Sequence, residues 1–106
     1  MKYLSEALSV NSHISELNLN SNYIGTFPDD MKYLSEALKN NSAIKELYLN
    51  LNKLASHKIN LLNIVDALKK NKSIRHLDMR YNNLKDEQKN NLNECLKNIY
   101  LYEIYL

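Results

Sequence analysis

The stretch MKYLSEAL at residues 1–8 recurs without a change at residues 31–38, thirty positions later. The same offset relates ISELNL at 14–19 to IKELYL at 44–49 and then to IRHLDM at 74–79. Self-similarity at a fixed period is the signature of a repeat protein, in which each unit buries its apolar side only against its neighbours. The chain is therefore expected to be a stack of similar units.

Each unit carries the pattern L-x-x-L-x-L-x-x-N-x-L, in which an asparagine and an apolar residue follow the Leu-x-Leu segment. These pairs are Asn22 with Ile24, Asn52 with Leu54, and Asn82 with Leu84. A shortened fourth copy places Leu101, Ile104 and Leu106 where Ile14, Leu17 and Leu19 stand in the first. We expect a single domain with units at about 1–30, 31–60, 61–87 and 88–106, the last of them incomplete.

The two halves of each unit have different periodicities. Leu4, Ala7 and Leu8 follow the three-and-four spacing of a helix with one buried stripe, whereas the Leu-x-Leu segments alternate like a strand. Acidic or hydroxyl side chains predict helix starts at Pro28-Asp29-Asp30, at Ser56 and at Asp86-Glu87. Asparagine tolerates the left-handed conformation that closes many helices, which predicts helix ends near Asn11, Asn41 and Asn71.

Alternating strands and helices predict an α/β solenoid. Units too small to bury their own apolar side stack into a parallel sheet backed by helices. Strands lie about 4.8 Å apart whereas packed helices lie about 8–10 Å apart, so the sheet must line the concave side. The expected fold is a right-handed α/β horseshoe arc, with the sheet on the concave face and the helices on the convex face.

At this point the chain resembles a known family, the ribonuclease-inhibitor-like leucine-rich repeats that also occur in NOD-like receptors and bacterial effector proteins. The most specific stretch is ALKNNSAIKELYLNLN at 37–52, and Lys85-Asp86-Glu87 looks like the family's helix start. The thirty-residue period is slightly longer than is usual for the family. The resemblance implies a protein-binding module and a buried, structural asparagine ladder at Asn22, Asn52 and Asn82.

The outward-facing strand positions are the candidate partner-binding residues, because strand side chains alternate between the two faces of a sheet. We expect three columns and two flanking residues on the concave face: Glu16, Glu46, His76 and Glu103; Asn18, Tyr48, Asp78 and Tyr105; Asn20, Asn50 and Arg80; and Leu51 and Tyr81. Tyrosine and arginine are enriched at interface hot spots, so Tyr48, Arg80, Tyr81 and Tyr105 are the predicted anchors. The alternative is that these side chains form cross-strand pairs that only stabilise the sheet.

No catalytic, cofactor or metal site is expected. His13, His57 and His76 fall in a loop, a helix-start region and a strand of different units, and no serine or cysteine nucleophile shares a column with His76. The single cysteine, Cys95, stands at the position of Ala7, Ala37 and Ala67, so we predict that it is buried by packing. The sequence therefore indicates a protein that is not an enzyme.

The net charge and the hydropathy of the chain limit the classes of partner that we expect it to bind. A net charge of +2 is too small to draw in nucleic acid, and no apolar run approaches the roughly 18 residues that would span a bilayer. Because the start also lacks the apolar stretch of a signal peptide, a cytoplasmic location is expected, with non-classical export as an effector left open. The expected partner is therefore a protein.

The ends of the predicted sheet suggest a second function. The segment 101–106 is a β-prone edge without Pro or Gly, and such edges favour further pairing. The leading hypothesis is a protein-interaction module that binds through the concave face. The alternative is a self-assembling or fragmentary solenoid whose terminal edges mediate homo-oligomerisation.

Overall fold

The structure, a computed structural model, describes residues 1–97, 99, 101 and 103–106, so Tyr102 of the predicted terminal edge lies outside the described residues. Helices and strands alternate along this part of the chain. The elements are α1 (Lys2–Val10), β1 (Glu16–Asn18), the 3-10 helix η1 (Ile24–Thr26), α2 (Pro28–Asn40), β2 (Glu46–Tyr48), the 3-10 helix η2 (Leu54–Ser56), α3 (Lys58–Lys70), β3 (His76–Asp78), α4 (Asp86–Cys95) and β4 (Glu103–Tyr105).

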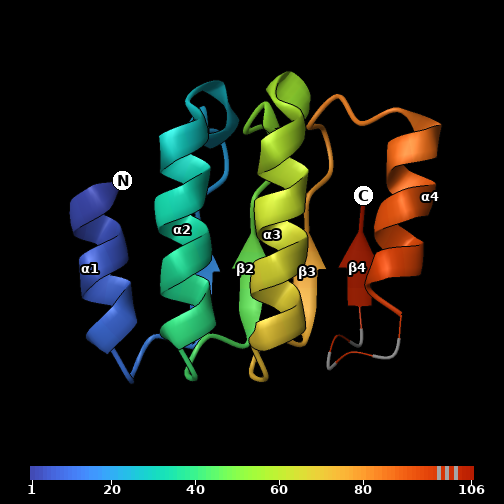
Figure 1. The fold of residues 1–106 in the computed structure, drawn as a ribbon. Helices are drawn as coiled ribbons and strands as arrows, with labels where there is room; N and C mark the ends of the chain where they lie inside the picture. The colour runs from blue at the N-terminus through green and yellow to red at the C-terminus, as the bar shows by residue number, and fades with distance from the viewer. Residues whose placement is uncertain (98, 100, 102) are drawn as a thin grey trace.

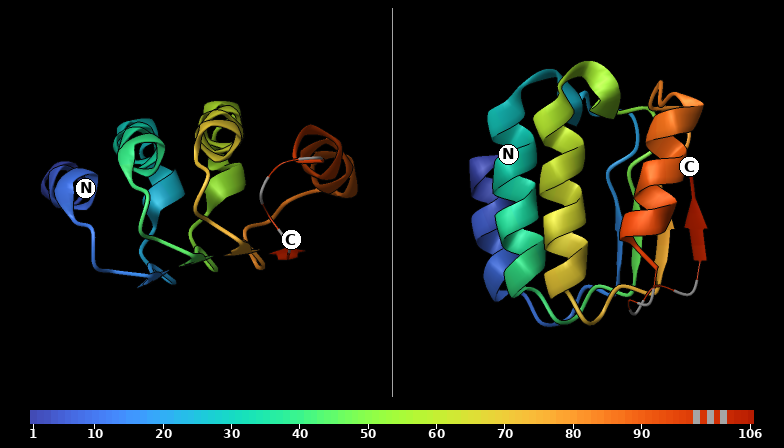
Figure 2. Two further views of the ribbon diagram at one scale, coloured as in Figure 1. Left: turned by 90° about the horizontal axis from the view of Figure 1, so that it is seen from below. Right: turned by 45° about the vertical axis from the view of Figure 1, so that its right-hand side comes forward.

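The four strands form one parallel sheet in the order β1-β2-β3-β4. All four helices cover the same face of this sheet (Figure 1). In Figure 2 the helices lie further apart than the strands beneath them, as expected when wide helix packing meets narrow strand spacing. The predicted α/β architecture of a parallel sheet backed by helices is confirmed.

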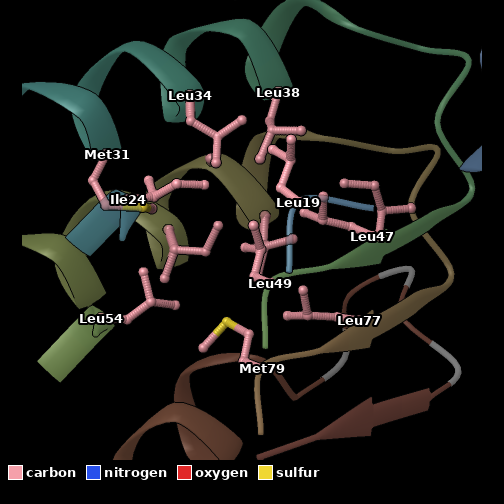
Figure 3. Packing of buried hydrophobic residues seen from close by; sticks show 14 of the residues in the cluster. Leu19, Ile24, Met31, Leu34, Leu38, Leu47, Leu49, Leu54, Leu77 and Met79 are labelled. Atoms are coloured by element: carbon pink, nitrogen blue, oxygen red, sulfur yellow. The ribbon is translucent and has the colours of Figure 1, made fainter. Parts of the chain in front are cut away.

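The hydrophobic core fills the space between the sheet and the helices (Figure 3). Leu47 and Leu77 point inward from β2 and β3, Leu49 and Met79 follow them at the strand ends, and Leu34 reaches down from α2; all five are fully buried. The residues between them face the other side because strand side chains alternate. Within the described part of the chain, that other side of the sheet carries no helix.

The helix ends lie where asparagine predicts them, but the reason differs from the expected one. Asn11, Asn41 and Asn71 follow α1, α2 and α3 with φ between −95° and −74°, so none of them is left-handed. The Asn41 side chain instead accepts hydrogen bonds from the Ala43 and Ile44 amides and donates to the carbonyls of Leu8 and Asn11 in the preceding repeat. Asn71 makes the equivalent bonds one repeat later. The two amides therefore tie successive helix ends together.

Left-handed backbone occurs instead in the loops that leave the strands. Six residues, none of them glycine, have φ between 55° and 62°: Ser21, Tyr23, Leu51, Lys53, Tyr81 and Asn83. They flank the asparagine of the repeat pattern on both sides in all three units. The same tight turn is thus built three times.

The fourth helix stands apart from the other three because the loop before it is shorter. α4 begins at Asp86, as predicted, but only two residues after Leu84, whereas α3 begins at Lys58, four residues after Leu54 and two residues later than the predicted start at Ser56. Between α3 and α4 lies a groove of about 490 Å³. Cys95 lines this groove and is exposed, so the prediction that it is buried is wrong.

Candidate functional site

The strand register brings the predicted columns together on the helix-free side of the sheet, which we call the open sheet face. Glu16 pairs with Glu46, Glu46 with His76, and His76 with Glu103. One column further along the strands, the pairs join Asn18, Tyr48, Asp78 and Tyr105 in the same way. Neighbouring members of a column are one strand spacing apart, about 4.8 Å.

Three rings form a continuous aromatic row on the open sheet face. The His76 ring lies between Tyr48 and Tyr105, with ring centroids 5.2 Å and 5.3 Å apart. The Tyr105 hydroxyl donates a hydrogen bond of 2.8 Å to Oε2 of Glu103, and Nδ1 of His76 lies 3.6 Å from the same oxygen. Offset ring contacts of this kind hold large side chains in place. The row is therefore a semi-rigid apolar surface with polar edges.

Carboxylates give the same face a negative potential. Burial, followed by the charges of Glu46 and Glu16, raises the pKa of the Tyr48 phenol. The hydrogen bond to Glu103 raises the pKa of Tyr105 because only the protonated phenol can donate it, and the negative charge of Glu103 raises the pKa further. Both phenols therefore stay neutral over the physiological pH range. The negative charge of this face comes from the carboxylates of the column that holds Glu16, Glu46 and Glu103.

Asp78 and Arg80 form a tight ion pair at the edge of the aromatic row. Arg80 donates from Nε to Oδ1 at 3.0 Å and from Nη2 to Oδ2 at 2.7 Å, and its guanidinium lies 5.4 Å from the Tyr105 ring centroid and 6.0 Å from that of Tyr81. Asp78 is only 3 % exposed, although it was expected to face a partner. The carboxylate is buried because Arg80 folds back over it, so Arg80 is the contact surface there.

The ion pair between Asp78 and Arg80 predicts that part of the free energy of unfolding is lost in acid. The Arg80 guanidinium holds the pKa of Asp78 below its ordinary value of 3.8, so the stabilisation is present above that value and is lost as pH falls through the lowered pKa. Asp78→Asn should therefore flatten the decline in unfolding free energy below about pH 4, measured by urea denaturation at a series of pH values. An unchanged slope in the variant would contradict the assignment.

The asparagines of the open sheet face are engaged within the sheet. Asn18 Oδ1 accepts from the Asn20 amide at 3.0 Å, and Asn20 Oδ1 accepts from the Asn50 amide at 2.7 Å. These oxygens order the strand ends and are less available to a partner than the sequence suggested. Leu51 and Tyr81 are exposed in the left-handed turns that border the face.

A shallow cavity adjoins the Arg80 end of the face. It has a volume of about 400 Å³ and is lined by Arg80, Tyr81, Asn82, Asn83, Leu84, Lys89 and Leu106. Two of the predicted anchors, Arg80 and Tyr81, therefore stand beside a recess that could receive a protruding side chain. Sequence reasoning did not find this recess, because it lies where the loop after β3 meets Lys89 of α4 and Leu106, and the repeat pattern does not place these segments against one another.

The asparagines of the repeat pattern lie beyond the strand ends, away from the aromatic row. Asn52 and Asn82 are buried, and Oδ1 of each accepts backbone amide hydrogens from the preceding repeat. Their Nδ2 groups donate to the carbonyls of Leu19 and Leu49. Asn22 is exposed, because no described repeat precedes its own. Buried polar groups need such partners, so the geometry suits a structural role.

The histidines are not brought together. His13 lies in the loop after α1, and Nε2 of His57 lies 3.1 Å from the Thr26 carbonyl, far along the chain from the aromatic row that holds His76. Within the described residues no three His, Cys, Asp or Glu side chains are placed to hold a metal ion. In the same part of the chain, no helix combines the length and apolar character that crossing a bilayer requires.

Comparisons with known proteins agree with this geometry. The family model described as Leucine Rich Repeat matches residues 13–34. Among solved structures, the fold is similar to "Leiomodin-1 Actin-Binding Site 2 (ABS2)", with a TM-score of 0.55 and 16 % identity over 95 % of this chain and 75 % of that one. The tropomodulin C-terminal domain from Caenorhabditis elegans matches at a TM-score of 0.35 and 10 % identity, over 88 % of this chain and 91 % of that one. A sequence search of curated proteins finds no match. The chain thus contains a leucine-rich repeat, and its parallel sheet backed by helices is a leucine-rich-repeat type of fold.

Proposed function

We propose that this protein is a non-enzymatic interaction module that binds a protein partner through the open sheet face. The observation that carries the proposal is the aromatic row of Tyr48, His76 and Tyr105, in which Tyr105 is exposed and the other two rings are half-buried, with charged groups on both sides. Aromatic side chains bring a large, semi-rigid contact area, and they dominate binding energy where they are enclosed by a partner. We also infer that the repeats are of the ribonuclease-inhibitor-like class, on the motif at 37–52.

Charge favours a partner with basic side chains. Glu16, Glu46 and Glu103 share one column, whereas the positive charge of Arg80 is largely offset by Asp78. A lysine or arginine from a partner would meet a carboxylate on this column and an aromatic ring beside it. The partner segment is therefore proposed to be basic, with apolar or aromatic side chains for the row.

Truncating the tyrosines is the direct test. Tyr48→Ala and Tyr105→Ala should each weaken binding of the partner by about 30-fold, the equivalent of a hot spot of about 2 kcal/mol, measured by titration calorimetry. Tyr23→Ala is the matched control, because Tyr23 is an exposed tyrosine that lies in the loop before η1, away from the open sheet face. The control should leave the affinity unchanged.

The partner can be found by photo-crosslinking. A photoreactive benzoylphenylalanine at position 48 should capture a discrete protein, whereas the same group at position 33, on α2, should not capture it. Capture from position 33 with none from position 48 would overturn the proposal. Purified actin is a suitable first probe, because the structurally similar leiomodin-1 domain is named an actin-binding site. The proposal does not depend on that outcome.

A second proposed function is homo-oligomerisation through the terminal edges of the sheet. The outer edges of β1 and β4 carry no partner strand among the described residues. Unpaired edges present backbone donors and acceptors that another chain can use. Oligomer size that survives Tyr48→Ala and Tyr105→Ala would separate this function from partner binding.

A further inference from the structure

The same helix surface occurs on α1 and on α2, where it is exposed on α1 and covered on α2. The octapeptide MKYLSEAL of α1 is repeated in α2, yet Ala7 is exposed where Ala37 is buried, and Tyr3 is 81 % exposed where Tyr33 is 42 % exposed. The α2 copy is covered because α1 packs against α2. The α1 copy therefore presents a surface that is known, from this fold itself, to pack against a helix.

The open copy continues along α1 as an uncharged stripe. Tyr3, Ala7 and Val10 follow helical spacing on the side away from α2, and Val10 is 83 % exposed. The equivalent of Val10 is Asn40 in α2 and Lys70 in α3, so this position is apolar only in the first repeat.

The backbone edge beside this stripe also lacks a partner strand among the described residues. At the two ends of β1, the Ser15 carbonyl accepts hydrogen bonds from the amides of Lys45 and Glu46, and the Leu19 amide donates to the Tyr48 carbonyl. Odd-numbered residues of the strand therefore turn their backbone groups toward β2. Glu16 and Asn18 turn theirs to the open edge, because backbone groups alternate along a strand.

We propose that this end binds a second copy of the same chain in a two-fold symmetric dimer, in which β1 pairs antiparallel with β1 of the partner copy and α1 packs on α1. This inference rests on the second proposed function and narrows it to one edge and one symmetry. In the register centred on Leu17, Glu16 lies opposite Asn18 of the other copy. That pair turns its backbone groups toward each other, as a hydrogen-bonded antiparallel pair requires.

Charge and closure both favour this arrangement over a head-to-tail one. Parallel pairing of β4 with β1 of another copy, in the register of the existing sheet, would place Glu103 opposite Glu16 and add a second pair of like charges beside the Glu16–Glu46 pair that the sheet already holds. In the antiparallel register centred on Leu17, each Glu16 lies opposite an uncharged asparagine. Head-to-tail contacts also repeat without limit, whereas the two-fold contact closes on itself.

The first experiment measures mass by light scattering over a hundredfold range of concentration. The wild type should reach a dimer and stop, and Tyr3→Asn/Val10→Lys should halve the mass. Both replacements stand at the equivalent positions of α3, as Asn63 and Lys70, so the helix tolerates them. Leu62→Lys, which copies Lys32 at another exposed apolar position, is the control that should stay dimeric.

The second experiment tests the register by disulfide formation in a Cys95→Ala background. An equimolar mixture of Glu16→Cys and Asn18→Cys chains should cross-link, whereas each variant alone should not. Hydrogen-bonded antiparallel partners have Cα atoms about 5.5 Å apart, which suits a disulfide.

The outcomes of these experiments test two claims separately, the existence of a dimer and its two-fold arrangement. A monomer at every concentration would overturn both the dimer and the second proposed function. Species that keep growing beyond a dimer, a dimer that survives Tyr3→Asn/Val10→Lys, or cross-linking of Glu16→Cys with itself would overturn the two-fold arrangement alone. None of these results bears on partner binding by the open sheet face.

Discussion

Asn52→Ala should lower the free energy of unfolding by about 3 kcal/mol, because it leaves several buried backbone groups without a partner. The Asn52 side chain accepts from the amides of Asn22 and Ile24 and donates to the carbonyls of Leu19 and Asn50. It is fully buried, so water cannot replace these bonds. Urea denaturation followed by circular dichroism measures the loss.

The first repeat supplies the matched control. Asn22 occupies the same position in its unit but is exposed, and its side chain donates only to the carbonyls of Leu19 and Asn20. Asn22→Ala should cost less than about 1 kcal/mol, since water can solvate the groups that lose their partner. Equal losses in the two variants would contradict the view that burial makes the Asn52 amide important.

Gly25→Ala should destabilise the fold by about 3 kcal/mol, the upper end of the cost of overpacking a well-packed core. A methyl group on Gly25 would collide with the carbonyl group of Lys53 and would lie 2.7 Å from Cα of Leu54. These are backbone atoms at the start of η2 and of the residue before it, so they cannot move aside as a flexible side chain would. Thermal and urea denaturation should both show the loss, with the circular dichroism spectrum of the folded state retained.

The next repeat shows why this glycine is needed only once. Ala55 occupies the equivalent position of η2, and there β3 is followed by no 3-10 helix in the described residues, so the methyl group of Ala55 is tolerated. Ala55→Gly should cost about 0.5–1 kcal/mol from backbone entropy alone. A Gly25→Ala variant as stable as the wild type would show that η1 can shift away from η2.

The fold was predictable because a thirty-residue period fixes the phase of the inward leucines in the three full repeats. Leu17, Leu47 and Leu77 align in neighbouring strands as the period requires, and Ile104 of the shortened fourth copy joins them. The burial of a side chain at the edge of the repeat stack was not predictable in the same way, because it depends on how closely the neighbouring repeat packs. Asn22 is exposed because no described repeat precedes its own, and Cys95 is exposed because a shortened loop keeps α4 away from α3.

The candidate site was predictable in outline and not in detail. Strand alternation places Tyr48, His76 and Tyr105 on one face, but the stacking of their rings depends on side-chain rotamers that no pattern encodes. The burial of Asp78 depends likewise on Arg80 folding back over it. The role of Asn41 and Asn71 was missed, although their recurrence at the repeat period marked them as structural.

The asparagine side chains that join successive repeats determine the order in which the repeats open. Asn41 and Asn52 belong to the second unit but hold backbone groups of the first, and Asn71 and Asn82 do the same for the second. Each unit is thus held by hydrogen bonds from the unit after it, and these bonds stabilise only the nearest neighbouring unit. Local opening should then begin at the outer units, leaving β2 and β3 as the last part of the molecule to exchange its amide hydrogens with water.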